Sequence, residues 1–216
     1  MGKNDVVRQG AAENYLLVEG NDDEHVFYSL LVHHRIPKHF TIKKTVGKDK
    51  LLETFRVELK IGAVKRLGIV IDADTDIKAR WLSIRNILIA SHYSDVPLNS
   101  DPNGTIIQQE GLPIVGVWIM PNNKIPGYLE DFVSFLVPSG NVLWPMTDEA
   151  IQKVKLVEAG VRFKDVHESK ARIHTWLAWQ EEPGKPMGQA ITARYLDADV
   201  PHVQQLLNWI RKMFIS

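Results

Sequence analysis

The sequence predicts an α/β protein with a mainly parallel sheet flanked by helices and a mostly helical C-terminal part. Short apolar runs rich in β-branched residues alternate with amphipathic stretches along much of the 216-residue chain. Alternating strands and helices are typical of right-handed parallel β–α–β units. The run Leu67–Ile71 has no polar alternation, which indicates a strand buried on both faces. We expect an α/β domain over residues 13–138 and a helical extension over 139–216 that packs on the same domain.

The individual elements follow from hydrophobic period and from Gly, Pro and Asp punctuation. Strands are expected at 15–18, 40–46, 67–71 and 114–120, and a small hairpin joins 105–109 to 112–120. Helices are expected at about 22–34, 48–61, 77–92, 128–137, 147–159, 168–180 and 201–214. Residues up to about 14 are expected to form a flexible lead-in. No internal repeat or low-complexity segment interrupts this order.

Composition limits the function classes. The 26 basic residues balance the 26 acidic residues, so no global field indicates nucleic acid or membrane, although charge can still segregate locally. The absence of cysteine excludes disulfides and thiolate metal sites. The N-terminal stretch lacks the apolar core of a signal peptide, and no apolar run approaches the roughly 20 residues of a membrane span. We expect a cytoplasmic protein that has no membrane partner.

Acidic side chains lie at the ends of two predicted strands and at the start of a later predicted helix. Asp72, Asp74 and Asp76 come directly after the central strand, Glu19 and Asp23 follow the first strand, and Glu130 and Asp131 begin a later helix. Carboxyl ends of parallel strands meet at one edge of the sheet, so we expect these carboxylates to converge there. Clustered carboxylates suit Mg²⁺ or Mn²⁺. The competing interpretation is helix capping and solvated turns, which also favour Asp.

These motifs resemble the Toprim domain, which is shared by topoisomerases, primases, a ribosomal-RNA maturase and the OLD-family nucleases. The resemblance rests on Glu19-Gly20 followed by Asp23, and on Asp72-Ala73-Asp74 followed by Asp76. The segment GYLEDF at 127–132 is closer to OLD-type nucleases and to small standalone Toprim-like proteins than to topoisomerases. The resemblance covers about residues 13–137 and implies a Rossmann-like, Toprim-like fold.

The resemblance implies phosphodiester hydrolysis that depends on Mg²⁺ or Mn²⁺, with nucleic acid as the substrate and DNA favoured over RNA. It implies roles for seven acids: Glu19 as metal ligand or general acid/base, Asp72 and Asp74 as metal ligands, Asp76 as a third ligand, and Asp23 with Glu130 or Asp131 at a second metal. Two cations about 3.5–4 Å apart can stabilise the attacking and leaving oxygens of an in-line displacement. Neither a topoisomerase tyrosine domain nor a primase zinc module is visible, which favours hydrolysis.

OLD-type nucleases add a lysine to the acids, and two late lysines are candidates. Lys170 lies on a predicted helix that Trp176 and Trp179 would anchor, and we favour it over Lys185, which lies in a Gly/Pro loop. A solvated surface lysine is the ordinary alternative for both. Such enzymes often carry an ATPase domain. The turn at 47–50 is not a P-loop, so an ATPase or another protein would have to be a partner.

Histidine and tryptophan give weaker signals. His33, His34 and His39 are close in the sequence, but adjacent histidines on a helix point apart and no HExxH motif occurs, so we expect surface or capping roles rather than a zinc site. The tryptophans are expected in the core, with the exception of Trp144, which lies in the loop-like VLWPM segment and could stack on a base.

Two further function classes stay open. One is a regulatory module that binds a metal–nucleotide or nucleic acid without cleaving it and works with a partner protein. The other is a phospho-acceptor receiver, which is weaker, because a receiver needs an acid pair after its first strand and a lone acceptor aspartate after its third.

Overall fold

The computed structural model describes residues 13–157 and 162–215. The expected lead-in lies outside these residues up to position 12, and so does the expected end of the helix at 158–159. Among the described residues, no helix combines the length and the apolar character that crossing a membrane requires.

A five-stranded sheet forms the centre of the molecule, in the order β2-β1-β3-β5-β4. The strands are β1 (Asn14–Val18), β2 (Thr41–Lys44), β3 (Arg66–Asp72), β4 (Thr105–Ile107) and β5 (Ile114–Met120). All neighbouring pairs are parallel except β4, which lies antiparallel on β5 at the edge. This sheet confirms the mainly parallel α/β fold, including the small hairpin.

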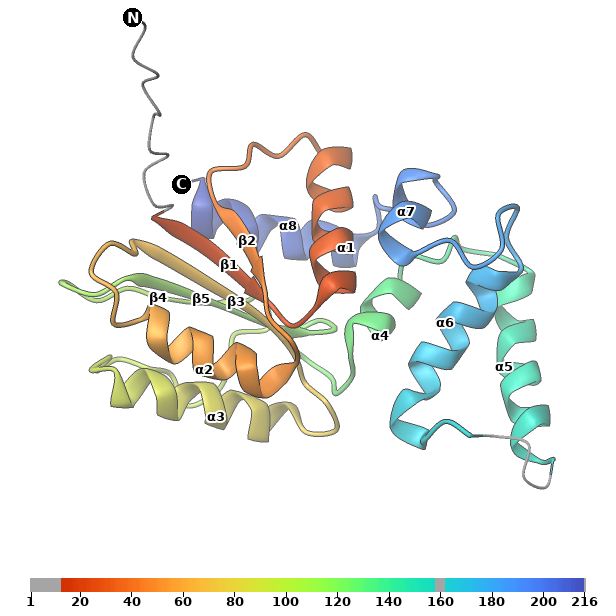
Figure 1. Cartoon of the computed structure of the whole chain (residues 1–216), viewed down its shortest axis with the longest axis horizontal. Coiled ribbons are helices and arrows are strands. Elements are labelled where there is room, and N and C mark those ends of the chain that lie inside the picture. The colour runs from red at the N-terminus through yellow and green to blue at the C-terminus, as the bar shows by residue number, and fades with distance from the viewer. Residues whose placement is uncertain (1–12, 158–161, 216) are drawn as a thin grey trace, which may run out of the picture.

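Helices cover both faces of the sheet (Figure 1). The α-helices are α1 (Asn21–His33), α2 (Lys48–Glu58), α3 (Ile77–Ala90), α4 (Leu129–Ser134), α5 (Leu143–Lys155), α6 (Glu168–Ala178), α7 (Met187–Thr192) and α8 (Pro201–Phe214). In Figure 1, α2 and α3 lie along one face and α1 and α8 along the other, while α5 and α6 form a pair beside the sheet. The expected helical C-terminal part is therefore present, and its last helix returns to the sheet.

Side-chain alternation along the strands divides the core into two layers. Leu16 and Trp118 belong to the layer that includes α1, α4, α6, α7 and α8. Leu17 and Ile69 belong to the layer that includes α2 and α3. Because both faces are covered, the central strands are apolar on both sides, as the uninterrupted run in β3 predicted.

Two glycines let α8 approach the sheet closely. Gly68 and Gly116 are register partners on β3 and β5. A Cβ at Gly68 would lie 2.9 Å from the Phe214 ring, and one at Gly116 would lie 2.7 Å from Met213 Sδ. Because neither glycine has a side chain, the end of α8 can pack directly against the backbone of β3 and β5.

The prediction of a loop around Trp144 is wrong. Helix α5 begins at Leu143, four residues before the expected start, because the Asn141 side chain accepts hydrogen bonds from the Leu143 and Trp144 amides (3.0 and 3.1 Å). Pro145 lies in the first turn, where its missing N–H costs no helical hydrogen bond. The Trp144 ring is half-buried and packs edge-on against Trp176, so it contributes to packing within the protein.

Candidate functional site

Glu19 and Asp72 meet at the carboxyl edge of the sheet because their strands, β1 and β3, are parallel neighbours. The Asp72 amide donates a hydrogen bond to Glu19 Oε1 (2.9 Å). The Asp72 carboxylate in turn accepts a bond from the Leu129 amide, the first N–H of α4 (3.0 Å). A helix N-terminus favours negative charge, so α4 helps to hold Asp72 in place.

The carboxylates at this edge raise one another's pKa. Burial and then the charges of Glu19, Asp23, Glu130 and Asp74 raise the pKa of Asp72 well above its ordinary value. Asp23, buried in the first turn of α1, has its pKa raised to about 7 by burial and by Glu19. Burial also raises the pKa of Glu19, against the opposing effect of the Asp72 amide and of nearby cations. Buried like charges of this kind are typical of functional sites.

Asp74 is held by two basic residues that the sequence did not reveal as part of the site. Its backbone lies in the left-handed region (φ 54°), and its carbonyl accepts a bond from the Gly127 amide (2.8 Å). Its carboxylate pairs with Lys48 Nζ (3.0 Å) and with the Arg80 guanidinium. Arg80 also donates from Nε to the Asp72 carbonyl (2.7 Å). A ligand role for Asp74 therefore requires that these contacts loosen or that the metal shares the carboxylate.

Asp76 and Asp131 cap helices: their carboxylates accept hydrogen bonds from backbone amides at the start of a helix. Asp76 is exposed and its Oδ1 accepts the amides of Lys78 and Ala79 (2.9 and 3.0 Å), which caps α3. Asp131 accepts the Tyr128 amide in the capping box of α4 (2.8 Å) and the Ser169 hydroxyl (2.5 Å). The structure thus places both carboxylates where the capping interpretation expects them.

Glu130, on α4, and Lys170, on α6, lie beside the acids that follow β1 and β3. Lys170 Nζ, on α6, lies 3.2 Å from Glu130 Oε1 at the start of α4, and the Glu130 side chain is only 13% exposed. Both residues line a pocket of about 220 Å³ together with Asp72 and Tyr128. Lys185, the other candidate, pairs with Glu182 (2.7 Å). Of the two lysines, Lys170 is the one placed at the carboxylates.

The oxygen donors of this site are the kind that a hard divalent cation prefers. Five carboxylates that act on one another, namely Glu19, Asp23, Asp72, Asp74 and Glu130, face three bases, namely Lys48, Arg80 and Lys170. With all groups ionised, five negative and three positive charges leave an excess of two negative charges, which one divalent cation would balance. Among the described residues, however, no three of these acids bring a ligand atom each within 4.8 Å of one another. Mg²⁺ commonly uses one or two carboxylates and fills its other positions with water and phosphate.

Comparison with known proteins gives a family. A family model described as "Protein of unknown function (DUF3226)" matches residues 13–215. The chain belongs to this family. No curated protein matches the sequence. A solved structure with a similar chain path is the C-terminal region of the OLD protein of Xanthomonas campestris pv. campestris, with 12% identity and a TM-score of 0.46 over 94% of this chain and 97% of that one.

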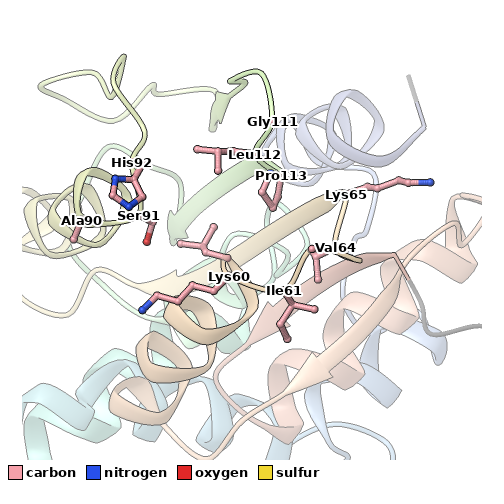
Figure 2. A pocket seen from close by; sticks show the side chains of 12 residues that line it. Lys60, Ile61, Val64, Lys65, Ala90, Ser91, His92, Gly111, Leu112 and Pro113 are labelled. Carbon is pink, nitrogen blue, oxygen red and sulfur yellow. The ribbon is translucent and has the colours of Figure 1, made fainter.

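A larger pocket of this DUF3226 protein lies away from the acids (Figure 2). It measures about 560 Å³ and is formed by the segment that follows α2, the end of α3 and the segment 111–113 that precedes β5. None of its 12 lining residues is acidic. Figure 2 shows Lys60 and Lys65 extending outward rather than toward each other. The candidate site is therefore the smaller pocket at the carboxyl edge of the sheet, lined by Asp72, Glu130 and Lys170, which we call the charged pocket.

Proposed function

We propose that the chain is a divalent-metal-dependent phosphodiester hydrolase that acts on nucleic acid, with DNA favoured over RNA. The observation that carries this proposal is the gathering of acids at the carboxyl edge of the sheet, where Glu19 lies beside Asp72 and where Asp72 and Glu130 line one pocket. Burial and four neighbouring acids raise the pKa of Asp72 there. Lys48, Arg80 and Lys170 offset only part of the charge of these five partly buried acids, and a bound Mg²⁺ or Mn²⁺ would offset the rest. When bound, such a cation neutralises the charge of a phosphodiester and activates a water molecule.

Glu19, Asp72, Asp23 and Glu130 are the residues that we assign to metal binding. Glu19 and Asp72 are fixed by backbone hydrogen bonds, which keeps their carboxylates at the edge of the sheet. Asp74 completes the set if its pairs with Lys48 and Arg80 open. The roles of Asp76 and Asp131 as ligands stay predictions, and each would cost a helix cap. Glu19 is also our candidate for general acid/base, since it lies beside Asp72 and burial raises its pKa above the ordinary value.

The basic residues around the acids would bind the phosphate groups of the substrate. Lys170 reaches the charged pocket from α6 and is half exposed, so it can leave Glu130 for a phosphate oxygen. Lys48, the first residue of α2, is also partly exposed beside Asp74. A balanced total charge disfavours tight non-specific binding, which depends on a basic excess. We therefore propose that a partner protein, such as an ATPase, assists substrate capture.

The test is cleavage of labelled single- and double-stranded DNA and RNA with Mg²⁺ or Mn²⁺, compared with EDTA. We expect metal-dependent cleavage that Glu19→Gln and Asp72→Asn each reduce by at least about a hundredfold. Glu53→Gln and Asp95→Asn are matched controls, because both side chains are exposed and lie outside the charged pocket. These controls should keep full activity.

Two outcomes would contradict hydrolysis by the chain. Cleavage that survives both site substitutions would indicate a contaminating nuclease. Wild-type protein that binds Mn²⁺ but leaves every substrate intact would favour the non-cleaving regulatory module, and a partner would then be sought.

A further inference from the structure

A second cluster of metal-binding side chains lies at the other end of α1. His33 Nε2 is 3.4 Å from Asp199 Oδ1, and His34 Nε2 is 3.9 Å from the same oxygen. These three residues are the only group of histidine or acidic side chains, among the residues that the structure describes, whose ligand atoms all lie within 4.8 Å of one another. His33 lies ten positions after Asp23 on a helix, or roughly 15 Å along its axis, so this cluster is separate from the acidic site.

The two histidine rings meet because α1 ends between them. The expectation that adjacent helical histidines point apart is wrong here: His34 is the C-cap residue (φ −90°, ψ 8°) and has left the helix. The ring centroids are 4.7 Å apart at 66°, and both rings face the segment between α7 and α8 that carries Asp199. Sequence spacing alone could not reveal this cluster, because its third member lies 165 positions after His34.

The spacing of these atoms suits a tetrahedral transition-metal ion. Zn²⁺ binds imidazole nitrogen and carboxylate oxygen at about 2.0–2.1 Å, so neighbouring ligands of a tetrahedral site lie about 3.4 Å apart. The His33–Asp199 distance already has this value, and the His34–Asp199 distance needs a shift of about half an ångström. His34 Nε2 lies 2.9 Å from the Ala198 carbonyl, a hydrogen bond that metal binding must replace. Nitrogen ligands disfavour Mg²⁺.

The cluster is accessible to an ion from solution. The side chains of His33 and Asp199 are 32% and 70% exposed, and that of His34 is 11% exposed. His34 also lines an open pocket of about 270 Å³ beside Arg35 and Arg211. These two arginines place positive charge nearby, which weakens cation binding but would favour water or a small anion as the fourth ligand.

We propose that His33, His34 and Asp199 form a binding site for Zn²⁺ or a similar transition-metal ion. The bound ion ties the carboxyl end of α1 to the segment that enters α8. Its role is structural, since it joins two elements that are distant in sequence. The proposal is independent of catalysis at the acidic site.

The experiment titrates tag-free protein with Zn²⁺ and follows Tm, and it titrates Co²⁺ and follows the visible absorption of cobalt bound to nitrogen and oxygen. At a hundredfold excess of Zn²⁺ over Kd, Tm should rise by about 5–10 °C, whereas Mg²⁺ should not reproduce this shift in the Asp72→Asn protein. Because Zn²⁺ and Co²⁺ could also bind the acidic site, the cluster is tested in the Asp72→Asn protein, where adding Asp199→Asn or His33→Ala should each abolish the shift and the cobalt spectrum. His39→Ala, an exposed histidine outside the cluster, and Asp72→Asn, in the acidic site, should retain both.

The circular dichroism spectrum of each variant in EDTA establishes that it is folded. A zinc shift that disappears in Asp72→Asn, or that persists when Asp199→Asn or His33→Ala is added to Asp72→Asn, would place the ion elsewhere and overturn the proposal. The absence of any shift or spectrum in the wild type would also overturn it, and would leave the cluster as a surface ion pair.

Discussion

Asp72 is the residue at which stability and proposed activity oppose each other most directly. Its carboxylate is useful because four other acids surround it, and for the same reason its charge is costly when no cation is bound. Substituting the charge should therefore separate the two properties. Residues that are suboptimal for stability are frequent at functional sites.

We predict that Asp72→Asn raises the free energy of unfolding in EDTA by about 1 kcal/mol, although it reduces metal-dependent cleavage by at least about a hundredfold. The asparagine oxygen can still accept the Leu129 amide, so the contact with α4 is retained. The measurement is urea unfolding, with Asp95→Asn as a surface control that should differ from the wild type by less than about 0.5 kcal/mol. A variant that is less stable than the wild type would show that the carboxylate is structurally required and not strained.

At the scale of elements, hydrophobic period predicted the order of strands and helices, whereas ends and side-chain partners needed the tertiary structure. The central strand was recognisable because β3 is apolar on both faces. The start of α5 was missed because Pro145 resembles a loop signal, although it is harmless in a first turn. Arg80, on α3, and Lys48, on α2, both form ion pairs with Asp74. No local sequence pattern marks either base as part of the site.

Tyr93 connects two elements and makes the high-pH stability of the fold testable. It follows α3, is buried, and its hydroxyl donates to the Pro113 carbonyl just before β5 (2.7 Å). Burial raises its pKa from 10.0 to about 12. Because the folded state holds this proton more tightly than the unfolded state, the stabilisation is complete below about pH 10 and is lost as pH rises toward 12.

We predict that Tyr93→Phe lowers the free energy of unfolding by about 1 kcal/mol at pH 8, since the Pro113 carbonyl loses a buried donor. The difference between wild type and variant should shrink between pH 10 and 12, because the variant lacks the ionising group. Urea unfolding of both proteins at several pH values measures this difference. A constant difference across the range would mean that Tyr93 titrates alike in both states.

At the scale of the whole molecule, the C-terminal helices form part of the core that covers one face of the sheet. Seven residues of α8 are buried, among them Trp209 and Phe214. Trp209 packs against Trp118 of β5, and the Phe214 ring stacks on Phe40, which precedes β2. The same layer contains residues of α6 and α7. The boundary at 138/139 therefore divides the sequence at a point where the packing is continuous.

We predict that a chain ending at Pro138 does not fold into a stable monomer. Burial of one large apolar side chain contributes about 1.5–3 kcal/mol, so the loss of α8 alone removes roughly 10 kcal/mol or more. This equals or exceeds the net stability of a typical domain. The exposed sheet face would include Leu16 and Trp118, which should make the fragment aggregate. Circular dichroism and urea unfolding, with the full chain as control, measure the outcome. A cooperative transition in residues 1–138 would show instead that the α/β part is an independent domain, and that the helices from 139 onward were added to a sheet already stable without them.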